Sequence, residues 1–174
     1  MSITVEDKGG SFEELVKGLA FIKSHDVYVG IQQANDVRKE SKENKNKVAI
    51  TNAELLFIHT NGSPINNIPA RPVIEPAIKD DNDRLSSMMK KAAQLALSGK
   101  FTEALTQLKL TGMRGQNVSR AWFLNSKNGW PPNSPAVQAA KRRKGSTDPK
   151  PLIDTGELRK SITYFVKGKG GRMK

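Results

Sequence analysis

The chain has 174 residues, the length of about one domain, and a net charge of +12 from 29 Lys and Arg against 17 Asp and Glu. It has no cysteine, which excludes disulfides and thiolate metal sites, and its two histidines, His25 and His59, cannot form a metal site alone. The start carries acids and no apolar core segment, and no apolar run approaches the roughly 20 residues that span a membrane. We therefore expect neither a signal peptide nor a membrane span, and a protein kept in a cytoplasm-like compartment.

The N-terminal third predicts a helix, a strand and a charged loop. Ser11 and Glu14 have the spacing of a capping box, and apolar residues then recur at helical spacing, which predicts a helix over 12–23. Alternating apolar residues predict a strand over 26–31. Residues 35–47 are almost all polar or charged, so we expect a mobile loop, or an arm that orders on a partner.

The middle of the chain predicts helices separated by a stiff segment. A helix over 50–59 is stopped by Asn-Gly-Ser-Pro at 61–64, and His59 at its end is expected to be a cap or packing residue rather than a catalyst. Prolines at 69, 72 and 76 stiffen the next segment and hold Arg71, for which an anchor to a carboxylate of the same domain is favoured over an interfacial ion pair.

A long helix is then predicted over 73–97, ended by Gly99. A further helical pattern runs from 101 to 124, and because Gly112 and Gly115 weaken it, we expect one broken helix or two helices. Residues 128–133 are predicted to form an extended turn, and 141–144 an exposed basic loop.

The segment 151–166 contains more cap, turn and strand signals than any other stretch of the chain. Asp154 is predicted to cap a helical turn, with Glu157 reaching back to it and Gly156 allowing a tight turn. A strand follows, which could pair with the strand near 27–31. Asp154, Thr155 and Gly156 also resemble the loop of an aspartic protease, in which two such loops share a proton. Here a homodimer would have to supply the second loop, and charged residues follow where an apolar strand is needed, so the cap and turn are favoured.

Positive charge is concentrated at the C-terminal end, because residues 141–174 hold eleven Lys or Arg and three acids. Such a field attracts nucleic acid or an acidic protein surface. Cations and aromatics are not interleaved, so stacking on single strands is poorly supported. The candidates for an interface or a DNA-facing surface are Lys141, Arg142, Arg143, Lys144, Lys167 and Lys169.

Several motifs occur in a fixed order along the chain. They are the strand at 27–31, the helix ending near 60–62, Ile68, Pro69, Ala70, Arg71 and Pro72 with 75–77, Trp-Pro-Pro at 130–132, and 151–162 with Asp154, Thr155, Gly156 and Leu158. This ordered set resembles the neck, minor tail or tail-completion proteins of long-tailed bacteriophages, over roughly residues 26–166. The departures are the charged insert at 35–47, Val73 in place of an aromatic residue, and Asn-Gly at 61–62 in place of an acidic-aromatic-glycine turn.

The resemblance implies a virion structural protein at the head–tail junction or tail end, present in the host cytoplasm during assembly. It implies no enzymatic activity, and we expect no cofactor, metal, small-molecule substrate or membrane. The implied partners are copies of the chain in a ring, six- or twelve-fold, and adjacent head-completion and tail-terminator proteins, with a DNA contact in the passage as a further candidate.

The expected fold is α+β: one domain over 1–174, with a small, mainly antiparallel sheet beside three or four helices and long charged loops. Residues 35–47 are expected to be mobile, and 167–174 to form a basic flexible tail. The alternatives are a free basic nucleic-acid-binding protein and a dimeric aspartic protease acting through Asp154.

Overall fold

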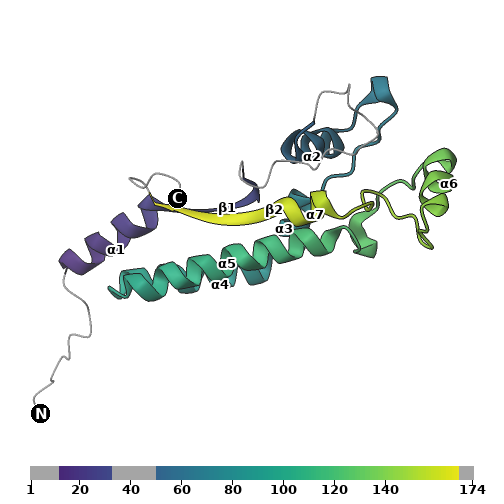
Figure 1. Cartoon of the computed structure of the whole chain (residues 1–174). Coiled ribbons are helices and arrows are strands. Elements are labelled where there is room, and N and C mark those ends of the chain that lie inside the picture. Colours follow the sequence, from purple (N-terminus) through teal and green to yellow (C-terminus); the bar gives the residue numbers. More distant parts are fainter. Residues whose placement is uncertain (1–11, 33–49, 169–174) are drawn as a thin grey trace, which may run out of the picture. The chain divides into compact units, whose positions relative to one another are not determined.

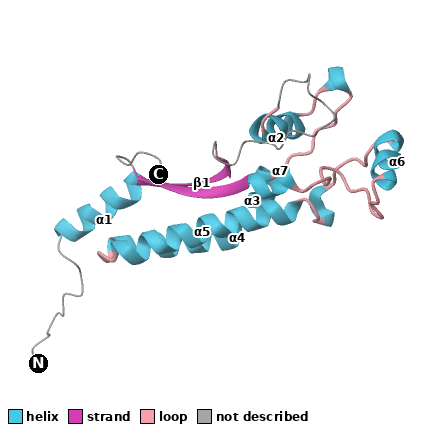
Figure 2. Cartoon of the chain, viewed as in Figure 1, coloured by secondary structure: helices cyan, strands magenta, loops and turns pink. Residues whose placement is uncertain are grey.

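The computed structural model describes residues 12–32 and 50–168, in which helices predominate and two strands pair as one antiparallel sheet (Figures 1 and 2). The α+β class is confirmed. These residues hold seven α-helices, more than the expected three or four, because short helices occur in the connecting segments. The elements are α1 (Phe12–Ser24), β1 (His25–Ile31), α2 (Asn52–Asn61), α3 (Ile74–Asp80), α4 (Asn82–Leu97), α5 (Phe101–Trp122), α6 (Pro135–Arg143), α7 (Glu157–Ser161) and β2 (Ile162–Gly168).

Contacts divide the chain into two compact units, each built from separate stretches of sequence. The described residues of unit 1 are 12–28, 83–112 and 165–168, and those of unit 2 are 29–32, 50–82 and 113–164. Helix α5 and both strands have residues in each unit. The organisation of 1–174 as one domain stays a prediction. The predicted loop at 35–47 and most of the predicted tail at 167–174 lie outside the described residues, as does Ser11.

In unit 1, helix α1 meets α4 at a glycine. Gly18 is the buried residue of α1, and a Cβ added there would lie 2.7 Å from the Ala96 carbonyl oxygen and 2.9 Å from the Leu97 Cα. Only glycine permits so close an approach of two helix backbones. Phe21 extends the contact, since its ring lies 5.4 Å from that of Phe101. The predicted helix over 12–23 is confirmed.

The two strands pair as the sequence suggested. The rings of Tyr28 and Phe165 stack with their centroids 4.9 Å apart. The antiparallel register that sets Tyr28 opposite Phe165 also sets His25 opposite Gly168, and the His25 ring lies beside that glycine. Figure 1 shows the two strands running side by side. The predicted pairing of the segments near 27–31 and 161–166 is confirmed.

Unit 2 has a compact apolar core, and α5 runs through it without a break. Gly115 is buried, and a Cβ there would lie 2.8 Å from Val29 Cγ2 and 3.3 Å from Ile78 Cδ1. The expected break near Gly112 and Gly115 is therefore wrong, because at Gly115 the glycine permits close packing inside a continuous helix. The buried core residues are Val73, Ala77, Trp122, Phe123, Leu158 and Ile162.

The single helix predicted over 73–97 is two helices, α3 and α4, separated at Asp81. Arg114 on α5 donates to both carboxylate oxygens of Asp81, from Nε at 2.6 Å and from Nη2. The hydrogen bond to Asp81 raises the pKa of Arg114, which burial opposes. The bidentate pair therefore ties the break to α5, which sequence periodicity could not reveal.

Helix α2 begins two residues later than predicted and has a capping box that sequence reasoning missed. The Thr51 hydroxyl accepts from the Glu54 N–H at 3.2 Å, and the Glu54 carboxylate accepts from the Thr51 N–H at 2.9 Å. The predicted stop is confirmed, since Gly62 has a positive φ of 75° and donates its N–H to the Ile58 carbonyl.

Gly18→Ala should loosen α1 from α4, because the added methyl meets main-chain atoms that cannot turn aside. We expect amide exchange over 12–24 to accelerate about tenfold, the equivalent of about 1.4 kcal/mol. Hydrogen exchange followed by mass spectrometry measures this. Gly30→Ala is the matched control, since a Cβ there meets nothing within 4 Å. Unchanged exchange of α1 in Gly18→Ala would contradict the packing described.

Candidate functional site

The motif residues 68–72 fold back on the end of α2. Ser63 and Ile68 form an antiparallel bridge, with Ser63 N–H donating to the Ile68 carbonyl at 2.8 Å and Ile68 N–H donating back at 3.0 Å. Arg71 N–H then donates to the His59 carbonyl at 2.5 Å. Gly62 permits this fold, since a Cβ there would lie 2.9 Å from Ala70 N. The segment is thereby fixed as a stiff crossing, as predicted.

Arg71 joins this segment to the Trp-Pro-Pro motif. Its Nε and Nη2 donate to the Pro131 carbonyl at 3.3 and 3.0 Å, and Nη2 also donates to the Pro132 carbonyl at 3.2 Å. In return, Trp130 Nε1 donates to the Pro72 carbonyl at 3.0 Å. Arg71 is 6% exposed, and burial lowers the pKa of its guanidinium.

The predicted carboxylate anchor for Arg71 is therefore wrong, although its internal role is right. Its partners are main-chain oxygens of two successive prolines. Proline has a carbonyl but no N–H, so a Pro-Pro segment carries more acceptors than donors and takes an outside donor. The planar guanidinium supplies several N–H groups in one plane, which suits two neighbouring carbonyls.

A second set of hydrogen bonds ties α6 to the loop that follows it. Lys141 Nζ donates to the carbonyls of Lys150 and Ile153 at 2.7 and 2.5 Å. Asn133 Nδ2 donates to the Pro149 carbonyl at 2.8 Å. Burial lowers the pKa of Lys141, and the charge of Arg71 lowers it further, against a raising effect of Asp154. Segments 68–72, 130–133 and 149–154 thus meet around two internal cations, an arrangement we name the carbonyl junction.

The prediction of an exposed loop at 141–144 is wrong in two respects: most of the segment is helical, and Lys141 is not exposed. Lys141 to Arg143 form the last turn of α6, Lys144 caps that helix, and Lys141 is partly buried and tied internally. Ser134 starts this helix by accepting the Val137 N–H, with Pro135 in the first turn. These start signals were present in the sequence and were missed.

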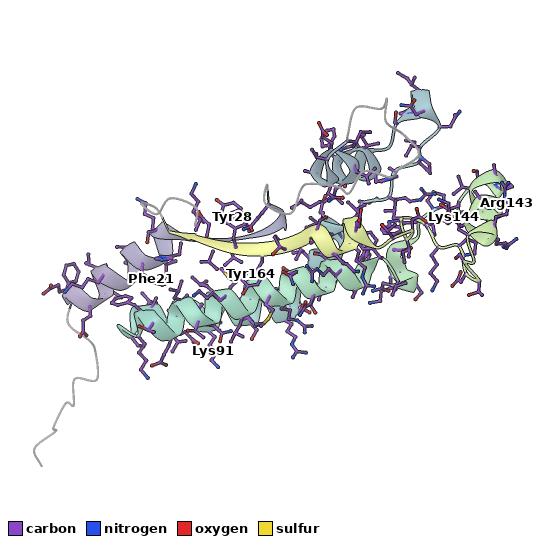
Figure 3. All side chains as sticks on the ribbon, in the orientation of Figure 1. Phe21, Tyr28, Lys91, Arg143, Lys144 and Tyr164 are labelled. Carbon is purple, nitrogen blue, oxygen red and sulfur yellow. The ribbon has the colours of Figure 1, made fainter. Side chains whose placement is uncertain are left out.

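The other candidate cations are placed differently. Arg142, Arg143 and Lys144 are exposed, and Figure 3 locates Arg143 and Lys144 at α6 and just after it. Lys167 is exposed on β2 and belongs to unit 1, whereas α6 belongs to unit 2. Lys169 lies outside the described residues.

Asp154 does not cap a helix, so that prediction is wrong. The residue preceding α7 is Gly156, with φ 76°, and no side chain caps this end. Thr155 Oγ1 accepts the Glu157 N–H at 3.4 Å instead. The loop is held by Lys141 at the Ile153 carbonyl, and Asp154 is exposed and lies two residues before Gly156, the cap position of α7. Leu158 is the core anchor of this motif.

Two arginines that sequence reasoning did not single out fasten the start of β2. Arg120 Nε donates to the Ile162 carbonyl at 2.8 Å, and its Nη2 to the Lys160 carbonyl at 2.7 Å. Arg159 Nε donates to the Arg120 carbonyl at 2.8 Å. This reciprocal pair joins the end of α5 to α7. No local sequence signal marks it, because its two halves lie about 40 residues apart.

No protein family, curated protein or solved structure matches this chain. Within residues 12–32 and 50–168, no group of three or more His, Cys, Asp or Glu side chains could hold a metal ion. None of the described helices is long and apolar enough to cross a membrane. The motif residues of unit 2 thus meet in a hydrogen-bonded junction.

Arg71→Lys should lower the free energy of unfolding by about 1–3 kcal/mol, because an ammonium cannot reproduce the fork that reaches two carbonyls. Urea denaturation measures the change. Arg143→Lys is the matched control, because Arg143 is exposed. Equal stability of the two variants would contradict a structural role for Arg71.

Lys141 should give the stability a distinctive pH dependence. Its folded-state pKa lies below the ordinary 10.5, so above the folded pKa and below 10.5 the unfolded chain binds more protons than the folded chain. Stability from this group is therefore smallest below the folded pKa and rises with pH toward 10.5. We expect the difference in unfolding free energy between the natural chain and Lys141→Met to grow from pH 8 to pH 10.5 in urea titrations. A difference that falls over this range would contradict the assignment.

Proposed function

We propose that the chain is a structural virion protein of a tailed phage, which acts in head–tail joining or tail completion by assembling with copies of itself and with neighbouring connector or tail proteins. Two kinds of support bear on this. The ordered motifs resemble those of phage neck and tail-completion proteins. In unit 2, three of these motifs are joined by hydrogen bonds in the carbonyl junction, which gives them a structural role.

The observation that carries the proposal is an exposed apolar stripe on α1. A surface helix of a protein that acts alone normally turns such a stripe toward its own core. Here Gly18, which lies about a quarter turn from the centre of this stripe at 100° per residue, makes the contact with α4. The stripe consists of Phe12, Leu15, Val16, Leu19 and Ile22, which are 38 to 82% exposed.

A second exposed apolar set lies on unit 2, at α2 and the turn after it. Phe57 is 70% exposed and Ile65 95% exposed. A ring is built from heterologous contacts, in which one patch meets a different patch on the next copy. Two unlike apolar sets on one chain are compatible with that requirement.

Two other functions remain as alternatives. A free basic nucleic-acid-binding protein is favoured by the exposed cations at the C-terminal end of α6. Infectious particles from phage lacking this gene, together with tight DNA binding by monomers, would support it. An aspartic protease would need Asp154 from two copies, with cleavage at acid pH abolished by Asp154→Asn. Asp154 is exposed, and its charge acts on Lys141.

The test is genetic complementation in the parent phage lacking this gene, with lysates viewed by electron microscopy. We expect the deletion to give full heads and separate tails. The natural chain and Ala20→Glu should restore joined particles, whereas Leu19→Glu should not, because a charge in the stripe carries a desolvation penalty in the interface.

Leu19 and Ala20 are adjacent, both exposed, and change by the same charge, so they differ mainly in their direction around α1. Light scattering of the purified variants should show a smaller oligomer for Leu19→Glu alone. Infectious particles from the deletion would refute the virion role, and equal behaviour of the two variants would refute the stripe as the contact.

A further inference from the structure

Helix α6 contributes little to the core of unit 2, yet it is firmly held. None of its residues is buried. It is nevertheless fixed by the Ser134 cap and by hydrogen bonds from Gln138 to the Asn133 carbonyl at 2.7 Å and from Lys141 to two carbonyls. The core therefore does not account for this helix.

What α6 presents is positive charge. Arg142, Arg143 and Lys144 are exposed, and within the described ranges their side chains have no ion-pair or hydrogen-bond partner. By contrast, Lys150 in the following loop is paired with Asp148 at 3.2 Å. Cations at a helix C-terminus also interact favourably with the helix dipole.

The arrangement of these cations selects the kind of ligand. Successive residues at a helix end point about 100° apart, so the three side chains fan out instead of converging on one small anion. A fan of this kind suits an extended polyanion. Because Lys141 and Asn133 hold the supporting backbone, little backbone entropy is lost on binding.

We propose that Arg142, Arg143 and Lys144 form a binding site for the phosphate backbone of duplex DNA, and that Lys141, although part of the same cationic run, is a positioning residue that does not contact the ligand. Binding is independent of base sequence, because the three cations meet phosphates rather than base edges. The site does not rest on ring assembly, since its residues belong to one chain.

The test is fluorescence anisotropy of a labelled duplex of arbitrary sequence with the full chain, from 50 to 300 mM KCl. Each phosphate contact contributes about −0.9 to the slope of log K against log salt concentration. Arg142→Gln/Arg143→Gln/Lys144→Gln should therefore flatten the slope by about 2.7 and weaken binding at least tenfold at low salt.

The matched control is Arg84→Gln/Lys90→Gln/Lys91→Gln, which removes three exposed cations from α4 and lowers the net charge equally. It should leave the slope nearly unchanged. Equal effects of the two triple variants would overturn the proposal in favour of general charge attraction. Displacement of DNA by poly-glutamate at equal charge concentration would also overturn it, in favour of an acidic protein partner.

Lys141→Gln gives a second readout. It should lower the unfolding free energy and keep the salt slope of the natural chain under conditions where it is folded. A slope flattened by about 0.9 would place Lys141 in contact with DNA and overturn its assignment as a positioning residue. Light scattering on the same samples reports assembly, so failure of DNA binding and failure of ring formation are seen separately.

Discussion

Unit 2 depends on cationic side chains that donate to main-chain carbonyls. Arg71, Lys141 and Arg120 each reach two carbonyls, and Arg159 reaches one. Segments rich in proline cannot satisfy their own carbonyls through a ladder, and a buried carbonyl without a donor is costly. Part of the chain's large positive charge is therefore architectural. An Arg or Lys that donates to carbonyls needs no acidic partner, so each such side chain adds one uncompensated positive charge to the protein.

How far the sequence predicted the fold depended on the range of each interaction. Periodicity located α1, β1, α2 and β2, because apolar spacing within one element is a local property, and the pairing of the strands followed because only two strand patterns were found. Reasoning from local sequence failed where a contact with a residue distant in the sequence determines the local structure. Gly115 was read as a helix breaker, yet its small size is required by Val29, which lies far away in the sequence. The break at Asp81 is likewise tied to α5 by Arg114.

The candidate site was predictable in its members but not in its partners. The prolines around Arg71 indicated a rigid, internal arginine, and Arg71 is buried. Its acceptors could not be read, because a proline carbonyl has no sequence signature that distinguishes it from any other carbonyl. In the same way, four successive cations at 141–144 look equivalent as letters. Helical phase directs one of them to carbonyls at 150 and 153 and leaves the other three exposed.

The contact between α1 and α4 likewise determines which face of α1 is exposed. Burying a large apolar side chain is worth about 1.5–3 kcal/mol, so leaving several of them exposed forgoes a substantial stabilisation. Helix α1 could bury its stripe by rotating, but rotation would replace Gly18 at the α4 contact by a side chain, for which the 2.7 Å approach leaves no room. The glycine therefore fixes which face is turned outward. A partner that docked on a stripe held in this way would cost less conformational freedom than one that docked on a loose helix, because the surface is already formed.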